Sequence, residues 1–245
     1  DDSDIVMGST ENLERGIFEL DALYSPKAIF VLTSSVTSII GTDIVGICDS
    51  LQSEVQSRLI PVNTSGLSAD YSAGLRKIYL QLAELFAKPA NTKQSKRYNI
   101  LGASPLHYRA ESDICEIESL LREAFGYELL HCLAMNTTTE AIAELGSAEL
   151  NIILAAEALP CAEYLQSVTG TPFVYLPPYG YSQTTEFLNS VAAVIGQPVK
   201  EAMLQRLEEK NRRLKMLLNS PLLSRTPGTV FLKGDYDTVK GLGDF

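Results

Sequence analysis

The stretch AIFVLTSSVTSIIGTDIVGI at residues 28–47 decides the fold class of this chain. Its apolar run at residues 29–32, which includes the β-branched Ile29 and Val31, favours a β-strand and ends in the small polar residues 33–35. Gly41 and Asp43 then precede the apolar periodicity of an amphipathic helix. A strand, a polar turn and a helix form the repeating unit of an open parallel α/β sheet, which usually binds ligands at the carboxyl ends of its strands.

The same alternation continues along the chain and predicts Rossmann-like parallel-sheet units with covering helices. Short β-branched runs predict strands at residues 28–33, 58–62, 98–101, 128–133, 150–155 and 173–176. Helical periodicity predicts helices at residues 12–23, 43–56, 113–124, 138–145, 160–168, 184–195 and 199–218, and a further long helix that ends at Phe86.

Changes in composition divide the chain into parts. Residues 88–96, KPANTKQSK, combine proline with polar and basic residues and lack periodicity, which is typical of a linker. The final stretch TVFLKGDYDTVKGLGDF predicts a strand, a turn and the start of a helix. We therefore expect part of a first α/β domain at 1–92, a middle domain at 93–196, a long helix and linker at 197–226, and the start of a truncated third unit at 227–245. The chain is expected to be a fragment.

Composition excludes some classes of function. The formal net charge is −10 and the isoelectric point is near 4.8, which disfavours nucleic acid as a partner because phosphate binding needs a basic face. The basic clusters at 93–97 and 210–215 are interpreted as solvated loop or helix faces. Charges, glycine or proline interrupt every apolar run, and the acidic start lacks the apolar core of a signal peptide. We expect a cytoplasmic protein without a membrane span.

Cysteine and histidine do not form a recognisable metal motif. The four cysteines are far apart without a C-x-x-C pair, and the two histidines have no ligand-like spacing. Cys48, Cys132 and Cys161 occupy apolar positions and are interpreted as buried free thiols. Cys115 is expected in the first turn of a helix, where a structural role is favoured over an activated thiol. No metal-ligand set is predicted.

Motifs for ordinary nucleotide and hydrolase chemistry are absent from the sequence. No G-x-G-x-x-G follows a predicted strand, and no Walker A sequence occurs, which disfavours dinucleotide or ATP binding. No G-x-S-x-G nucleophile elbow occurs either, so a classical hydrolase is disfavoured.

Four loops that follow strands of the middle unit are the candidate site. They are GAS at 102–104, MNT at 135–137, AAE at 155–157 and PPYGY at 177–181, and parallel strands should bring them to one sheet edge. Each residue alone is explained somewhat better as a turn or cap, with Asn136 or Thr137 capping one helix and Ser182 another. For the set we predict a shared cavity. The candidate cofactor-binding residues there are Gly102, Ser104, Asn136, Ala155, Glu157, Tyr179 and Gly180.

Several segments, in their order and spacing, resemble the nitrogenase component 1 family. That family includes the molybdenum–iron protein subunits, cofactor-assembly scaffold subunits and light-independent protochlorophyllide reductase subunits. The similar segments are DIVMGSTENLERGIFEL, PKAIFVLTSSVTSIIGTDI, RLIPVNTSGLSADYSAG, YNILGASPLHYRAESDICEIESLLREAFGYEL, AELNIILAAEALPCAEYLQSVTGTPFVYLPPYGYSQTTEFL and TVFLKGDYDTVKGL. The resemblance covers essentially the whole chain and implies a fragment of a three-domain subunit.

The resemblance also implies a redox role with partners. Family members form paired homologous subunits, hold an iron–sulfur cluster at their interface and accept electrons from an ATP-dependent iron protein. A substrate or metallocofactor binds in a cavity between the three domains. This chain departs from the pattern at two positions: Ser35 stands where the cluster-ligating cysteine is expected, and Ala155 where catalytic alpha subunits carry a cofactor-ligating cysteine. A serine hydroxyl is a far poorer cluster ligand than a thiolate.

These departures disfavour a dinitrogen-reducing alpha subunit. The function expected first is a nitrogenase component 1-like oxidoreductase subunit, and Ser35 joins the cofactor-binding candidates as an interface position. One alternative is a non-catalytic scaffold for metallocofactor or tetrapyrrole assembly. Another is a small-molecule sensor that uses the interdomain cleft. The fragment alone is expected to be inactive, because the family's site needs three domains and a second subunit.

Overall fold

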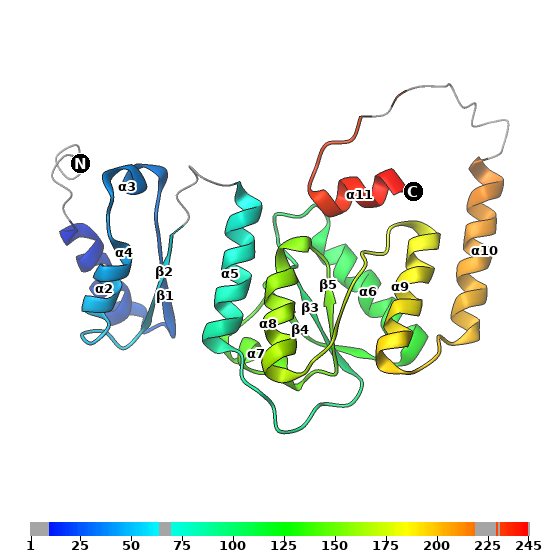
Figure 1. Cartoon of the computed structure of the whole chain (residues 1–245), viewed down its shortest axis with the longest axis horizontal. Coiled ribbons are helices and arrows are strands. Elements are labelled where there is room, and N and C mark those ends of the chain that lie inside the picture. The colour runs from blue at the N-terminus through cyan, green and yellow to red at the C-terminus, as the bar shows by residue number, and fades with distance from the viewer. Residues whose placement is uncertain (1–9, 64–69, 219–228, 230, 245) are drawn as a thin grey trace. The chain divides into compact units, whose positions relative to one another are not determined.

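The computed structural model describes residues 10–63, 70–218, 229 and 231–244 (Figure 1). The chain has the expected α/β fold with parallel sheets. It forms two compact units, unit 1 at residues 1–78 and unit 2 at residues 79–245. The division falls inside helix α5, Tyr71–Phe86.

Unit 1 contains a parallel pair of strands, β1 (Ala28–Leu32) and β2 (Arg58–Val62), in register from Ala28 opposite Arg58 to Leu32 opposite Val62. Helices α2 (Glu11–Tyr24) and α4 (Ile44–Leu51) supply the rest of its core. Ile29 and Val31 alternate inward along β1 because successive strand residues point to opposite faces. The core residues are Ile17, Ile29, Val31, Ile44, Cys48, Leu51, Val55 and Leu59.

Sequence reasoning missed a short helix, α3 (Ser35–Ile40), inside the segment that decides the fold. Ser34 and Thr37 form a reciprocal capping box at its start, in which the Ser34 Oγ accepts the Thr37 N–H at 3.2 Å. Gly41 ends it at φ +77°, a conformation that glycine adopts without strain. As expected, Asp43 then opens the next helix, where its carboxylate accepts the Gly46 N–H at 3.0 Å.

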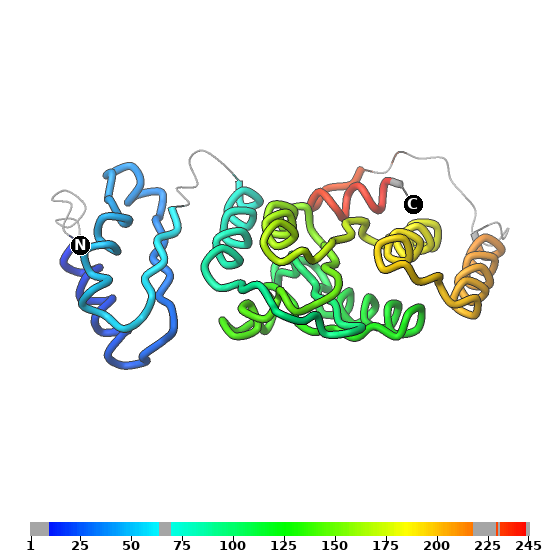
Figure 2. The backbone as a smooth tube through the Cα atoms, turned by 60° about the horizontal axis from the view of Figure 1, so that its bottom comes forward, coloured from blue at the N-terminus to red at the C-terminus, as the bar shows by residue number. Residues whose placement is uncertain are grey.

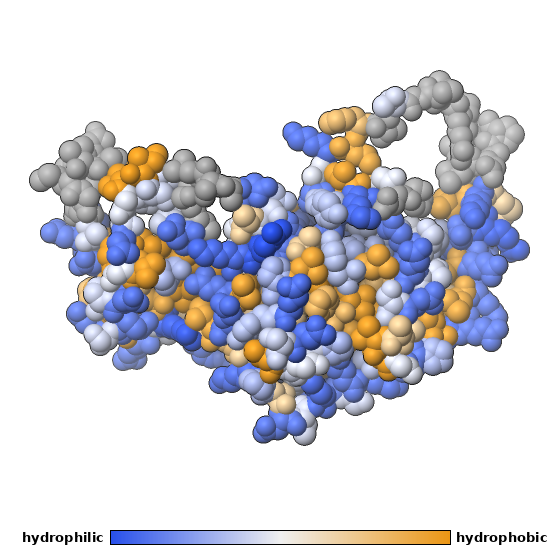
Figure 3. Space-filling view, viewed as in Figure 1, coloured by the Kyte–Doolittle hydropathy of each residue, from blue (hydrophilic) through white to orange (hydrophobic). Residues whose placement is uncertain are grey.

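Helix α3 presents apolar side chains to the surface. Val36 is 50% exposed and Ile39 is 72% exposed, and the face drawn in Figure 3 shows apolar residues gathered over this helix. None of the α3 residues is buried. Contiguous exposed apolar residues mark interaction surfaces more often than isolated ones do. Ser35 lies at the start of this apolar patch.

Unit 2 is a four-stranded parallel sheet. Its strands are β3 (Arg97–Leu101), β4 (Glu128–Leu133), β5 (Leu150–Ile153) and β6 (Phe173–Tyr175), close to the predicted ranges. They lie in the order β4-β3-β5-β6. From β3 the chain continues to β4 on one side, and from β5 it continues to β6 on the other side. Because the two connections diverge, a crevice opens at the carboxyl ends of β3 and β5.

Helices cover both faces of this sheet (Figures 1 and 2). On one face, α6 (Ala110–Phe125), α9 (Gly180–Ile195) and α10 (Glu201–Leu218) contribute Leu121, Phe187 and Met203 to the main core cluster. On the other face, α8 (Leu159–Thr169) buries Cys161 and Leu165. The short helices α7 (Thr139–Ala143), η1 (Leu145–Ser147) and η2 (Ala156–Ala158) fill the connections around β5.

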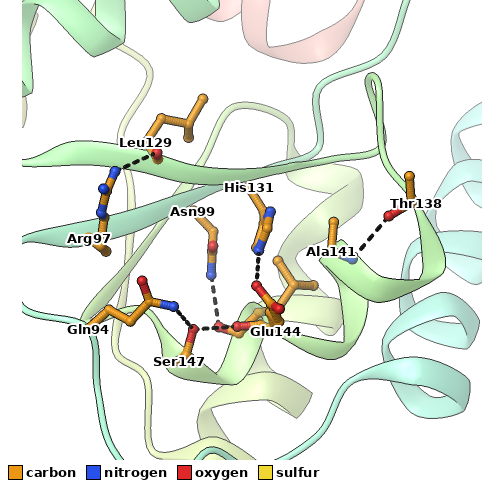
Figure 4. A network of polar contacts seen from close by, with 10 residues as sticks. Gln94, Arg97, Asn99, Leu129, His131, Thr138, Ala141, Glu144 and Ser147 are labelled. Carbon is orange, nitrogen blue, oxygen red and sulfur yellow. Dashed lines mark hydrogen bonds and ion pairs between the residues drawn. The ribbon is translucent and has the colours of Figure 1, made fainter.

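A polar network ties the segment at residues 88–96 into unit 2. The Gln94 amide donates to the Ser147 Oγ at 3.0 Å, and the Gln94 N–H donates to the Ser147 carbonyl at 2.7 Å (Figure 4). Fully buried Asn99 on β3 donates to the Leu145 carbonyl at 2.9 Å. Lys93, from a cluster interpreted as solvated, donates to the Gly146 carbonyl at 2.7 Å. The segment has no helix or strand, yet it is held by specific hydrogen bonds.

Some local predictions were wrong. Residues 229 and 231–233 are not in a strand, and residue 230 lies outside the described part of the chain. Neither Asn136 nor Thr137 caps α7; Thr138 does, and its Oγ1 accepts the Ala141 N–H at 3.2 Å. Ser182 lies inside α9 rather than at its cap, because that helix already begins at Gly180. Cap positions depend on the exact helix start, which periodicity fixes only to within a few residues.

The cysteines differ strongly in accessibility. Cys48 and Cys161 are buried as predicted, Cys132 is half-buried, and Cys115 is exposed in the second turn of α6 rather than the first. Burial raises the pKa of Cys132 to about 11 and that of Cys161 to about 12, so both thiols stay protonated and unreactive near neutral pH.

We expect brief alkylation of the folded chain at pH 8 to label Cys115 before the other three cysteines. The physical reason is exposure, since a maleimide must reach the sulfur before it can react with it. Mass spectrometry of tryptic peptides measures the labelling order, and labelling in urea is the control in which all four react. Early labelling of Cys161 in the folded chain would contradict the described burial.

Among the described residues, no helix combines the length and apolarity that crossing a bilayer requires.

Candidate functional site

A cavity of about 350 Å³ opens at the carboxyl edge of the unit 2 sheet. The loops after β3, β5 and β6 form its floor, and α6, α10 and the start of α11 (Tyr236–Asp244) form its walls. This is the crevice at which the strand order reverses, the usual ligand position in open α/β sheets. The residues that define its floor are Ala103, Leu154, Ala155, Pro177, Pro178, Tyr179 and Gly180.

Backbone packing at Gly102 shapes this floor. Gly102 has φ +86°, and a Cβ there would lie 2.9 Å from the Ala158 Cβ and 3.2 Å from the Ala155 N. Its N–H donates to the Leu133 carbonyl at 2.8 Å. The loops after β3 and β5 therefore approach so closely that only glycine fits between them.

The far wall of the cavity comes from residues 235–238. The Asp237 carboxylate accepts the Ala156 N–H at 2.9 Å and the Tyr175 hydroxyl at 2.5 Å. The Tyr179 and Thr238 hydroxyls are 3.1 Å apart. These bonds connect α11 to the loops after β5 and β6, more than 50 residues earlier in the chain.

Ionisable groups around the cavity are mainly acidic. Burial raises the pKa of Asp113 on α6 and that of Asp237 on α11, so both carboxyls hold their protons more tightly than usual. Burial also raises the pKa of Tyr175, and its hydrogen bond to Asp237 adds to this rise. Across the mouth, Arg206 on α10 forms an ion pair with Glu123 on α6. The cavity thus combines an apolar floor with a charged rim.

Three of the predicted site residues line this cavity: Ala155, Tyr179 and Gly180. Three others are buried beside it. Gly102 packs beneath the floor, Ser104 is 4% exposed and its Oγ accepts the Leu106 N–H at 3.2 Å, and Glu157 is 6% exposed. Their cofactor-binding role stays a prediction.

Asn136 and Ser35 lie elsewhere. Asn136, at φ +51°, borders a separate cavity of about 410 Å³ between α6 and β4, because β4 is the edge strand on the side of β3 away from β5. Ser35 belongs to unit 1 and is exposed there. The shared cavity predicted for four loops is therefore built by three of them.

Sequence reasoning missed the residues that the helices bring to the cavity. Asp113 comes from α6, and Arg206 and Lys210 come from α10. Asp235, Asp237 and Thr238 come from the GDYDT stretch, which was interpreted only as a turn. Asp235 and Asp237 stand at a helix start, where aspartates are common as caps, so their place in the sequence did not mark them as cavity residues.

The described residues do not fit an iron–sulfur cluster by themselves. Such clusters need several thiolate or equivalent ligands converging on one point. No group of three or more histidine, cysteine, aspartate or glutamate side chains has that arrangement within the described ranges. Ser35 contributes one exposed hydroxyl, and Ala155 offers no ligating side-chain atom.

Comparison with known proteins now connects this arrangement to a family. The sequence profile of nitrogenase component 1 type oxidoreductases matches residues 1–245. The chain belongs to the nitrogenase component 1 family. The resemblance noted in the sequence is thereby confirmed, as is the interpretation of the fold as part of a nitrogenase-like subunit.

Relatives of this family member come from two functional branches. The nitrogenase iron-molybdenum cofactor biosynthesis protein NifE of Clostridium pasteurianum is 25% identical over 86% of this chain and 46% of its own length. A light-independent protochlorophyllide reductase subunit of Jannaschia sp. is 29% identical over 89% of this chain and 40% of its own length. The corresponding subunit of Rhodopseudomonas palustris is 30% identical over 76% of this chain and 37% of its own length.

A solved structure shares the fold. Nitrogenase Cp1 at pH 5 superimposes with a TM-score of 0.66 at 22% identity, covering 89% of this chain and 43% of that chain. The chain thus spans less than half the length of the relatives it matches.

Proposed function

We propose that the chain is part of a nitrogenase component 1-like oxidoreductase subunit and that the cavity of unit 2 receives its substrate or metallocofactor. The observation that carries this proposal is the position of the cavity. The cavity lies where the strand order of the unit 2 sheet reverses, between β3 and β5. The start of α11 forms one of its walls, and the chain belongs to the nitrogenase component 1 family. We expect a cytoplasmic protein, as for a redox subunit served by an ATP-dependent iron protein.

The proposal includes a paired homologous subunit. The apolar side chains of α3, with Val36 and Ile39 largely exposed next to Ser35, support a protein contact at this face of unit 1. Since the described residues do not form a cluster site, any iron–sulfur cluster at this face would take its other ligands from outside them.

The test uses the complete polypeptide that contains this chain, purified without oxygen together with its paired subunit. With the reduced iron protein and ATP, an oxidoreductase subunit accepts electrons, which is measured as ATP-dependent oxidation of the iron protein. Metallocofactor bound without electron uptake would instead assign the scaffold function. A metal-free complex that binds only an organic ligand and takes up no electrons would overturn both.

Glu116→Trp is expected to weaken ligand binding to the cavity at least tenfold. Glu116 is exposed on α6 and lines the rim, so a tryptophan there fills the mouth without disturbing the core. Titration of the complete subunit with its substrate or metallocofactor measures the affinity. Glu111→Trp is the matched control, because Glu111 is exposed on the same helix but borders the other cavity. If both variants weakened ligand binding equally, the ligand would not bind specifically in this cavity.

Ser35→Cys is expected to raise the iron content of the anaerobic complex, because a thiolate binds cluster iron far better than a hydroxyl does. The substitution should not disturb α3, since Ser34 makes the capping bond. Iron and acid-labile sulfide are measured against Ser50→Cys, an exposed serine on α4. Unchanged iron in Ser35→Cys would argue that position 35 does not face a cluster.

A further inference from the structure

One buried carboxylate fastens α11 to the edge of the unit 2 sheet. Asp237 lies in the first turn of α11 and is 7% exposed. Its Oδ2 accepts the Ala156 N–H at 2.9 Å, and its Oδ1 accepts the Tyr175 hydroxyl at 2.5 Å. These two donors belong to the loop after β5 and to β6, so a single side chain spans two strand ends.

Near Gly241, α11 packs directly against the ring of Tyr179. A Cβ at Gly241 would lie 2.1 Å from the Tyr179 Cδ2 and 2.3 Å from its Cγ, so this turn of α11 rests directly on the ring. Gly243, two residues later, has no heavy atom within 4 Å of such a Cβ. Only one side of α11 is therefore in contact with the sheet edge near these glycines.

The groups that face Asp237 are acidic or phenolic. They are Glu157 from η2, Tyr175 from β6, Tyr179 from the loop after β6, and Asp235 from its own segment. Burial is the main reason that the pKa of Asp237 is raised, and the charges of Glu157 and Asp235 add to the rise. The hydrogen bonds from Tyr175 and Ala156 oppose it without cancelling it.

We propose that Asp237 is a proton-dependent latch that holds α11 over the cavity. When Asp237 is protonated, its Oδ1–H can donate to the Tyr175 oxygen while Oδ2 still accepts the Ala156 N–H, so both contacts persist in the neutral form. A carboxyl whose pKa is higher in the docked state binds its proton more tightly there. Docking is therefore favoured most strongly below the ordinary carboxyl pKa, and this contribution is lost as the pH rises through the raised pKa. Because Asp235, Asp237 and Thr238 line the cavity, release of α11 at higher pH removes one wall.

Hydrogen–deuterium exchange of the whole chain tests the latch without any cofactor or partner. Undocking removes the packing that shields α11, so the amides of residues 236–244 then exchange faster. After correction for intrinsic exchange rates, the protection of these amides should fall by up to about tenfold per pH unit between the ordinary carboxyl pKa and the raised pKa of Asp237. Protection of β3 and β5 should stay constant.

Two substitutions of Asp237 separate its charge from its hydrogen bonds. In Asp237→Asn, the amide oxygen can still accept the Ala156 N–H, and the amide NH₂ can donate to the Tyr175 oxygen, but nothing titrates. Its protection of residues 236–244 should be independent of pH. Asp237→Ala loses both bonds, so protection of residues 236–244 should fall at least about tenfold at low pH, where α11 of the unaltered chain is docked, and should no longer depend on pH.

Gly241→Ala tests the docked geometry by an independent route. Its methyl group would collide with the Tyr179 ring, so protection of α11 should fall about tenfold or more. Gly243→Ala is the matched control and should leave protection unchanged or raise it, because alanine favours helix more than glycine does.

Three results would overturn the latch. The first is pH-independent protection of α11 in the unaltered chain. The second is a pH dependence that persists in Asp237→Asn, which would place the sensor elsewhere. The third is unaltered protection in Asp237→Ala. None of these results bears on electron transfer, so the latch and the redox proposal can fail separately.

Discussion

Replacing Gly102 by alanine is expected to lower the free energy of unfolding by about 3 kcal/mol. The φ of +86° costs an L-residue about 1–2 kcal/mol, and forcing a methyl group into a filled space costs about 1–3 kcal/mol more. The new Cβ would meet the Ala158 Cβ and the Ala155 backbone, neither of which is the end of a flexible side chain. Urea unfolding followed by circular dichroism measures the change.

Gly126→Ala is the control for this prediction. Gly126 has a similar φ of +78°, but the nearest atom to its Cβ would be the mobile Lys96 Nζ at 3.7 Å. We expect it to cost only about 1 kcal/mol, from the left-handed conformation alone. Equal losses for the two variants would mean that the β3 and β5 loops can separate, and the floor of the cavity would then be less rigid than described.

Replacing Asn99 by valine is expected to lower the free energy of unfolding by about 3 kcal/mol, although valine favours strands. Asn99 is fully buried on central strand β3, where its amide donates to the Leu145 carbonyl at 2.9 Å and to the Asn151 Oδ1 at 2.8 Å. The substitution leaves both acceptors buried without this donor. Each such group costs about 1–3 kcal/mol.

A double-mutant cycle with Asn151→Val identifies the source of this loss. Asn99 and Asn151 are register partners on β3 and β5. Removing both members of a buried polar pair costs less than removing one and leaving the other unpaired. We therefore expect the double variant to be more stable than the sum of the single losses predicts, by about 1 kcal/mol. Additive losses would show that the two amides do not depend on each other.

Local patterns predicted the elements of the fold well. The strands β2 and β4 have the predicted bounds, and Asp43 opens its helix as expected, because strand propensity and capping depend on residues close in sequence. The same reasoning missed α3, whose six residues are too few to show helical periodicity. It also predicted a strand near residues 229–233, where apolar composition had no neighbouring strand to pair with in the described chain.

The sequence by itself determined the alternation of strands and helices, the parallel-sheet class and, through the order of its segments, the family. Tertiary structure alone decided which loops share the cavity. Ala155 and Tyr179 meet there while Asn136 does not, because β4 lies at the far edge of the sheet. Asp237 reaches Ala156 across 81 positions, and such a contact depends on strand order and packing rather than on any neighbouring residue.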